Sequence, residues 1–200
     1  TSSALKRIGI PGSKITVFSP VLDMKLINSV PHKAKTHTVI YAGRLIKEKR
    51  LDLWINAVAK AHSLDSSITG LIIGSGPMLE GLKLMAKPFP FIKFAKPFTA
   101  KKELYSELSK SMATLNMSER EGLSAITIES AALGTAPVLP SYTPIPKEVK
   151  ELAVVADKEK IPGILAKIAS GNAHYKPNAR RLKSFDSAKI NEVFEKLLRI

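Results

Sequence analysis

Short apolar runs rich in β-branched residues alternate along this sequence with stretches of helical periodicity. The first pair is the run 37–42, which predicts a strand, and the segment 49–63, whose apolar residues recur with a period near 3.6. The alternation predicts further strands at 69–73, 91–94, 112–117, 136–140 and 151–156. It predicts further helices at 78–87, 100–110, 125–133, 158–169, about 178–184 and 186–199. Such alternation is typical of a parallel sheet with helices on both faces. We therefore expect an α/β fold, a doubly wound parallel sheet of about six strands.

Residues 1–36 do not follow this alternation. They contain the end of a helix, a Pro-Gly turn, a strand expected at 14–18 and then an irregular stretch with two prolines. Such a stretch is typical of a linker. We therefore predict that residues 1–36 are the tail of a preceding domain with its linker, and that residues 37–200, including the C-terminal helices, form one α/β domain. The chain, which begins with threonine, is then expected to be the C-terminal half of a two-domain protein.

The charge of the chain favours anionic partners. It has 31 basic and 17 acidic residues, for a formal net charge of +14. Such an excess raises the local concentration of phosphorylated small molecules, anionic membranes or nucleic acids, although a lysine-rich soluble surface also accounts for it. The basic residues are spread along the chain, and the aromatic residues are too few for a base-stacking platform. We therefore expect no nucleic-acid partner.

Several site classes are excluded by composition. Cysteine is absent, which excludes disulfides, cysteine-bound zinc and a thiol nucleophile. The four histidines are scattered and no Asp-x-Asp pair occurs, so we expect no metal site. No apolar stretch approaches the ~18 residues of a transmembrane helix, and no secretory signal is visible.

Two loops after predicted strands carry candidate binding residues. In the segment 43–50, Gly43 permits close backbone approach, and Arg44 and Lys49 can reach one anion from a single loop. The alternative is a solvated basic turn. The segment 74–77 (GSGP) lacks the third glycine of a dinucleotide-binding fingerprint, so we interpret it as a structural strand-to-helix turn.

Two further loops follow later strands. The segment 94–99 can form the wall of a base pocket or part of the core, and Thr99 is expected to cap the next helix. In the segment 118–138, Ser124 is expected to cap a helix whose first amides form an anion site. Glu129, about one turn into that helix, can accept hydrogen bonds from ribose hydroxyls, and Glu121 can accept them from a sugar. Alternatively, both glutamates are surface charges favoured by the helix dipole.

In order and spacing, these segments resemble the C-terminal domain of the group 1 (family 4) glycosyltransferases, which have two Rossmann-like domains in the GT-B arrangement. The segment YAGRLIKEKRLD resembles the family's G-R-L-x-x-x-K-G-x-D segment, and EGLSAITIE resembles its E-x7-E signature. The segment LIIGSGP resembles the family's G-x-G-P turn, and AALGTAPVL resembles the A-x-G-x-P-V continuation of the E-x7-E signature. The segment IPGSKITVFSPVLD resembles the last strand of the N-terminal domain and its crossing into the second domain.

The resemblance implies that the chain binds a nucleotide-diphosphate sugar, of unknown base, without cofactor or metal. Arg44, Lys49 and Glu121 are the implied catalytic residues: the two cations bind the diphosphate, and Glu121 contacts the transferred hexose. Glu129 is implied to bind the ribose. The other implied donor-binding residues are Gly43, Lys96, Pro97, Gly122, Leu123, Ser124 and Ala125. The family retains anomeric configuration, and its chemistry is electrostatic stabilisation of a departing phosphate.

The resemblance also implies partners that this chain lacks. The family's acceptor site lies in the N-terminal domain, so we expect the chain alone to be inactive. We expect the enzyme in the cytoplasm, at the inner face of the membrane, where its charge favours anionic headgroups and a lipid-linked acceptor. A soluble enzyme is the alternative.

The chain departs from the family pattern in two loops. Arg50 stands where the family usually has glycine, and the segment 141–147 replaces a glycine pair that touches the sugar. A non-catalytic nucleotide-sugar-binding module is therefore one alternative, and a sugar-nucleotide epimerase of the same fold is another. The segments around Arg44 and between Glu121 and Glu129 favour the transferase.

Overall fold

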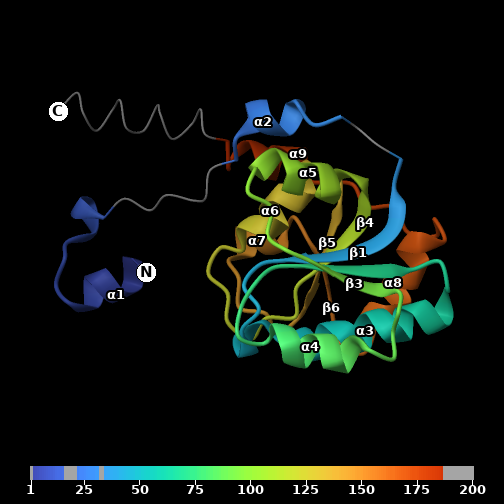
Figure 1. Cartoon of the computed structure of the whole chain (residues 1–200). Coiled ribbons are helices and arrows are strands. Elements are labelled where there is room, and N and C mark those ends of the chain that lie inside the picture. Colours follow the sequence, from blue (N-terminus) through green and yellow to red (C-terminus); the bar gives the residue numbers. More distant parts are fainter. Residues whose placement is uncertain (1, 16–21, 32–33, 187–200) are drawn as a thin grey trace.

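The computed structural model describes residues 2–15, 22–31 and 34–186. Within these ranges six strands form one parallel sheet in the order β3-β2-β1-β4-β5-β6 (Figure 1). The strands are β1 (Thr36–Ala42), β2 (Thr69–Ile73), β3 (Ile92–Ala95), β4 (Ser111–Leu115), β5 (Ala136–Pro140) and β6 (Val154–Ala156). The predicted doubly wound α/β fold is confirmed. The strand order reverses between β1 and β4, where ligands bind in folds of this class.

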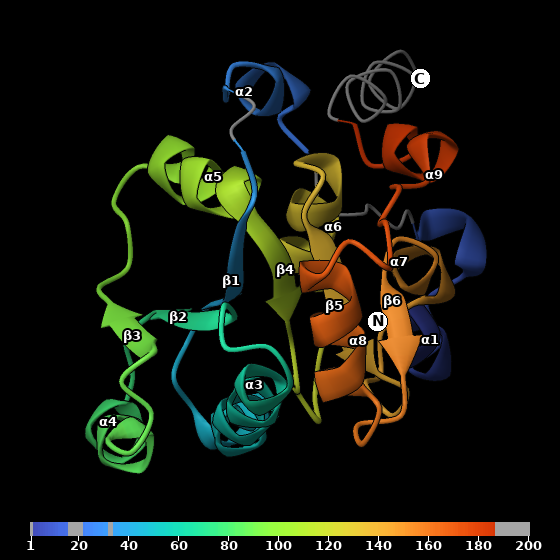
Figure 2. The ribbon, with the colours of Figure 1, turned by 90° about the vertical axis from the view of Figure 1, so that its right-hand side faces the viewer.

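The central strands are apolar because helices cover both faces of the sheet. Every residue of β4 and β5 is buried. The helices of the sheet layers are α3 (Leu51–Leu64), α4 (Leu79–Ala86), α5 (Lys101–Lys110), α6 (Ala125–Ala132) and α8 (Ile161–Ala169). In Figure 2, α3 and α4 lie below the sheet, and α5 and α6 lie above it.

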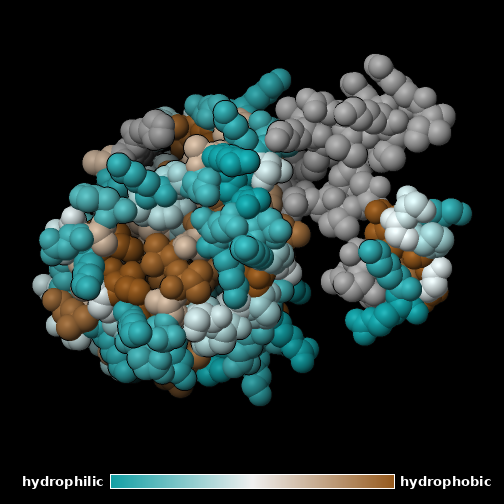
Figure 3. Space-filling view, turned by 180° about the vertical axis from the view of Figure 1, so that it is seen from behind, coloured by the Kyte–Doolittle hydropathy of each residue, from teal (hydrophilic) through white to brown (hydrophobic). Residues whose placement is uncertain are grey.

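Each face of the sheet has its own hydrophobic core. The core shared with α3, α4 and α8 contains the fully buried Trp54 and Ile72. The core shared with α5 and α6 contains Tyr105 and Ile128, together with Ile27. Hydrophilic side chains cover much of the face shown in Figure 3 and surround a hydrophobic area near the middle of that face.

Short elements complete the described part of the chain. They are α1 (Ser2–Arg7), η1 (Gly12–Lys14), α2 (Met24–Asn28), η2 (Lys47–Lys49), α7 (Lys147–Lys150) and α9 (Ala179–Lys183). The sequence predicts an irregular linker where α2 forms, because five residues are too few to show a period. Asp23 caps this helix by accepting a hydrogen bond from Leu26 N at 2.9 Å. The predicted division of the chain at residue 36 stays a prediction.

Some predicted boundaries are wrong. Lys14 belongs to η1 rather than to a strand, and the rest of the strand expected at 14–18 lies largely outside the described residues, as does the helix expected at 186–199. Helix α5 begins at Lys101 with Ala100 at the cap position, so Thr99 does not cap it. The strand expected at 151–156 is confined to its last three residues, because the chain before β6 turns out of α7.

The GSGP segment is the structural turn that the sequence predicts. A Cβ on Gly74 would lie 2.1 Å from the carbonyl oxygen of Gly43, and a Cβ on Gly76 would lie 2.4 Å from that of Leu45. Leu45 N also donates to Ser75 O at 2.8 Å. Two strand-end loops therefore pack backbone against backbone, which fixes the position of the loop that carries Arg44.

Candidate functional site

A cleft of about 530 Å³ lies at the carboxyl ends of the strands, near the point where the strand order reverses. Four segments form its walls: the ends of β1 and β2 with their loops, the segment before α5 with the start of that helix, and the first turns of α6. The lining residues are Ala42, Gly43, Arg44, Ile73, Gly74, Ser75, Pro97, Phe98, Thr99, Ala100, Lys101, Leu104, Ala125, Ile126 and Glu129.

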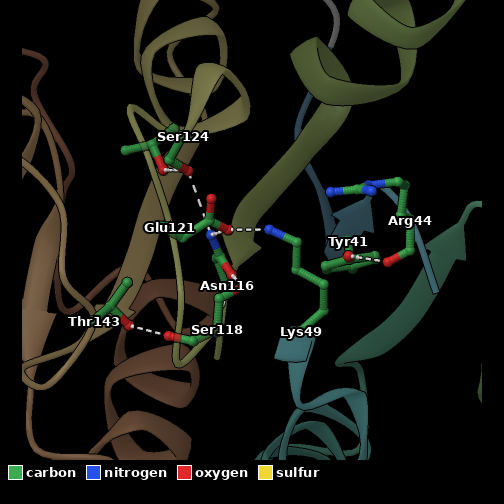
Figure 4. A network of polar contacts seen from close by, with 9 residues as sticks. Tyr41, Arg44, Lys49, Asn116, Ser118, Glu121, Ser124 and Thr143 are labelled. Atoms are coloured by element: carbon green, nitrogen blue, oxygen red, sulfur yellow. Dashed lines mark hydrogen bonds and ion pairs between the residues drawn. The ribbon is translucent and has the colours of Figure 1, made fainter. Parts of the chain in front are cut away.

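The cleft brings together part of the predicted site. Five of its lining residues were expected to bind a donor: Gly43, Arg44, Pro97, Ala125 and Glu129. Lys96 is exposed and does not line it. Of the other expected residues, Lys49, Glu121 and Ser124 belong to a second cluster around one ion pair (Figure 4). Leu123 packs instead against the core that α5 and α6 share, and Gly122 lies between it and Glu121.

One carboxylate oxygen of Glu129 is bound by neighbouring side chains, and the other is available to a ligand. Its Oε1 accepts a hydrogen bond from Tyr105 OH at 2.9 Å and forms an ion pair with Lys101 Nζ at 2.9 Å. In the described part of the chain, no hydrogen bond or ion pair engages Oε2. Burial raises the pKa of Tyr105 to about 12, so the phenol stays protonated and donates a hydrogen bond to Glu129. Oε2 can therefore accept hydrogen bonds from hydroxyl groups of a ligand.

Glu121 is held in the same manner. Its Oε1 lies 2.6 Å from Lys49 Nζ and 2.8 Å from Asn116 Nδ2. The side chains of Lys49 and Glu121 are only 17% and 11% exposed, so water screens this ion pair weakly. Again, no hydrogen bond or ion pair to Oε2 is found among the residues that the structure describes.

Asn116 organises the loop that carries Glu121. It is buried at the end of β4, and its Oδ1 accepts hydrogen bonds from Ser118 N at 3.1 Å and from Ser118 Oγ at 2.5 Å. Its Nδ2 also donates to Ser124 Oγ at 3.3 Å. The side-chain amide of Asn116 thus connects three residues of the loop. The sequence analysis did not identify Asn116 as part of the site, although a polar asparagine at the end of an otherwise apolar strand could have indicated it.

Ser124 occupies the predicted N-cap position of α6 but does not cap it. Its backbone lies in the left-handed region, with φ 50° and ψ 70°, and its hydroxyl bonds to Thr127 Oγ1 at 2.8 Å instead of to a helix amide. The first amides of a helix lack intrahelical partners. Ala125 and Ile126 line the cleft, so the positive end of this helix faces it.

Arg44 approaches the same region from the loop after β1. Tyr41 OH donates to Arg44 O at 2.8 Å, which fixes the backbone from which the guanidinium extends. Burial and the nearby Glu121 carboxylate raise the pKa of Tyr41, so its hydroxyl stays a neutral donor. Figure 4 shows the side chains of Arg44 and Lys49 directed toward the loop that carries Glu121.

Arg50 joins the two loops from the outside. Its φ of 48° lies in the left-handed region that favours glycine, which is the residue expected at this position from the family pattern. The guanidinium forms ion pairs with Asp52, at 2.9 Å, and with Glu119. Hydrogen bonding to Arg50 lowers the pKa of Asp52. Glu119 N also donates to Glu48 O at 3.1 Å, so side-chain and backbone contacts both connect the loops after β1 and β4.

The segment 141–147, which departs from the family pattern, contacts the loop after β4 and not the cleft itself. Tyr142 OH donates to Met117 O and Thr143 Oγ1 donates to Ser118 O, each at 3.1 Å. Neither residue lines the cleft. This segment therefore acts on the site through the loop after β4.

The described residues contain no group of three or more His, Cys, Asp or Glu residues arranged to hold a metal ion. None of their helices is long and apolar enough to cross a bilayer.

The sequence of the chain matches one known protein family. The family model of the group 1 glycosyl transferases matches residues 24–172. A sequence search of curated proteins finds no significant match.

Solved structures share the fold at low identity. Anabaena HepE in complex with UDP has a TM-score of 0.72 at 15% identity, over 99% of this chain and 61% of that protein. The pneumococcal O-GlcNAc transferase GtfA, in complex with UDP and GlcNAc, has a TM-score of 0.69 at 19% identity, over 95% and 39%. S. aureus TarM, in a complex that includes UDP, has a TM-score of 0.71 at 15% identity, over 97% and 38%. The chain thus spans between 38% and 61% of the length of these proteins.

Proposed function

Because the chain belongs to the group 1 glycosyltransferases, we propose that its cleft binds a nucleotide-diphosphate sugar as donor for retaining transfer of a hexose. The observation that carries the proposal is the available Oε2 of Glu129, which lies in a cleft that the positive end of α6 and Arg44 also line. Vicinal hydroxyls, a diphosphate and an apolar ring are the three chemical groups that such a cleft accommodates.

Each part of the donor has a matching part of the site. The ribose hydroxyls donate to Glu129, and the diphosphate meets Arg44 and the first amides of α6. The base lies against the segment that contains Pro97 and Phe98. Gly43 permits the close approach of the phosphates.

The second cluster acts on the bond that breaks. The Lys49 ammonium has three donors, so it can bind the diphosphate while it keeps its ion pair with Glu121. As the glycosidic bond breaks, negative charge grows on the departing nucleoside diphosphate, and Lys49 and Arg44 stabilise that charge. Glu121 accepts hydrogen bonds from the transferred hexose, next to the backbone of the segment 122–125.

The acceptor is held elsewhere in this proposal. The chain spans at most 61% of the three proteins compared above, so each of them has residues beyond the part that this chain matches. We therefore propose that another domain of a longer protein binds the acceptor, and that the chain alone binds donor without turnover. The net charge of +14 is consistent with action near an anionic membrane surface.

A thermal-shift panel with UDP, GDP and ADP tests the proposal. A ligand at 100 times its dissociation constant stabilises a protein by about 2.7 kcal/mol, which is a clear shift in melting temperature. UDP comes first because the three compared structures contain it. We expect one nucleotide to stabilise the chain, Glu129→Ala to remove the shift, and Glu80→Ala, a change at an exposed residue of α4, to preserve it. A panel without any shift would overturn the proposal.

A further inference from the structure

The contact between Lys101 and Glu129 has no counterpart in the sequence-based assignment of the site. Lys101 is the first residue of α5, and Glu129 lies on α6, so the contact bridges two helices at the wall of the cleft. The lysine side chain is 49% exposed, whereas the glutamate side chain is only 11% exposed. A carboxylate in such a position requires a partner that compensates its lost hydration.

The two donors of Glu129 form one unit. Lys101 and Tyr105 are four residues apart on α5 and therefore lie on the same side of the helix. The Lys101 ammonium lies 5.4 Å from the centre of the Tyr105 ring, and Tyr105 is fully buried. Burial alone would lower the pKa of Lys101, but the bonds to Glu129 and Tyr105 outweigh it and raise that pKa. The lysine therefore stays charged throughout the range in which proteins are stable.

We propose that Lys101 is a positioning and specificity-determining residue, which holds the Glu129 carboxylate so that the cleft prefers ribonucleotides to deoxyribonucleotides. The inference rests on the proposed function of the cleft and adds a residue to it. Both donors engage Oε1, which sets the plane of the carboxylate and directs Oε2 to the ligand. The terminal torsion of a glutamate is intrinsically broad, so the second donor has a real orienting effect.

Loss of Lys101 has two separable consequences. The carboxylate keeps only the Tyr105 bond and rotates more freely, which weakens the contact with ribose hydroxyls. Its negative charge also becomes uncompensated in a cleft that accepts a diphosphate. The first effect depends on the ribose hydroxyls, and the second acts on any diphosphate, including inorganic pyrophosphate.

Calorimetric titration of four proteins separates these effects. The proteins are the wild type, Lys101→Met, Lys101→Arg and Lys102→Met. Lys102 is the exposed neighbour that does not line the cleft, so its substitution changes the net charge equally. The probes are UDP, GDP and ADP, then the 2′-deoxy and 3′-deoxy forms of the tightest binder, and pyrophosphate.

We expect Lys101→Met to weaken ribonucleotide binding about tenfold, as loss of a charged hydrogen bond does, and to bring the affinities for ribose and deoxyribose forms close together. Lys101→Arg should keep the preference, and Lys102→Met should leave it unchanged. Pyrophosphate should bind Lys101→Met more weakly than Lys102→Met, because only the first substitution leaves the Glu129 charge uncompensated, and this weakening should be smaller than the loss for the ribonucleotide. In a double-mutant cycle, Lys101→Met and Glu129→Gln should be non-additive.

Two results would overturn the proposal, and they differ in meaning. If the wild type binds a nucleotide but Lys101→Met leaves the ribose preference intact, the role of Lys101 is wrong and the function of the cleft stands. If the wild type binds none of the three nucleotides, the proposed function itself fails, and the role of Lys101 fails with it. Unchanged circular dichroism of the variants confirms that each is folded.

Discussion

Lys49 Nζ lies 2.6 Å from Glu121 Oε1, and this ion pair joins the loop after β1 to the loop after β4. The two strands are neighbours in the sheet, at the position where the strand order reverses. A cation suited to a phosphate and a carboxylate suited to a sugar are thus in contact before any ligand arrives. In the proposed mechanism these are the groups on either side of the bond that breaks.

Substitution of Lys49 should weaken binding of the diphosphate part of the donor, and substitution of Glu121 should weaken binding of its sugar part. Lys49→Ala should weaken nucleoside diphosphate binding about tenfold, because it removes a charged hydrogen-bond donor. Glu121→Gln should leave diphosphate binding nearly unchanged and remove the additional affinity conferred by the sugar. Titration calorimetry with the diphosphate and its sugar form measures both effects, and Lys47→Ala, at an exposed lysine of η2, is the matched control. Equal losses for both ligands in Glu121→Gln would contradict the assignment.

Asn116 should contribute to stability as well as to the site. Asn116→Ala removes its hydrogen bonds to Ser118, Glu121 and Ser124, and leaves polar groups of a buried loop without partners. We expect the free energy of unfolding to fall by about 1–3 kcal/mol, as measured by urea denaturation. Asn56→Ala, at an exposed position of α3, is the control. A variant as stable as the wild type would show that the network is not required.

Two glycines provide a paired test of backbone packing. Gly74→Ala places a methyl group 2.1 Å from the carbonyl oxygen of Gly43, which is backbone and cannot rotate away. We expect a loss of about 3 kcal/mol, the upper end of the usual cost of overpacking. Gly81→Ala, in α4, meets no atom within 4 Å and should instead stabilise by roughly 0.5–1 kcal/mol. Thermal melts of the two variants give the comparison, and equal melting temperatures would contradict it.

Lys35 should make stability depend on pH in the alkaline range. Its ammonium donates to Thr135 Oγ1 at 2.8 Å, and although the residue as a whole is exposed, desolvation of its ammonium lowers the pKa of Lys35 to about 8. The unfolded chain binds this proton up to its ordinary pKa of 10.5, so stability should rise with pH between about 8 and 10.5.

Substitution by an uncharged residue gives the matching measurement. Lys35→Met should raise the melting temperature at pH 7, and this gain should disappear between pH 8 and 10.5. Melting curves of both proteins across that range test the prediction. A gain that is independent of pH would show that packing, and not charge, is responsible.

The sequence predicts the sheet well because its signals are local. Runs such as 37–42 and 136–140 are apolar and β-branched, and they form β1 and β5 with at most one residue of difference. The glycine pair at 74 and 76 marks its turn for the same reason. Helix α2 could not be predicted, since a five-residue helix depends on the packing of Ile27 more than on a repeating pattern.

The site is harder to predict because its contacts cross the sequence. Glu129 and Gly43 could be expected in one cleft, since both follow strand ends at one edge of the sheet. Nothing local connects Lys101 with Glu129, which is 28 positions away, and nothing distinguishes a capping serine from Ser124, whose hydroxyl turns to Thr127. The contact between Lys101 and Glu129 is set by how helices α5 and α6 pack, and the position of the Ser124 hydroxyl is set by its left-handed backbone.

The most direct test is to locate the nucleotide on the protein by NMR. The 15N-labelled chain would be titrated with whichever of UDP, GDP and ADP gives the largest thermal shift. We expect the largest amide shifts at Gly43, Ser75, Ala125 and Ile126, and we expect Glu129→Gln to abolish them. Shifts centred instead on the apolar groove between η2 and α4, around Met78 and Met85, or no shifts with any of the three nucleotides, would contradict it.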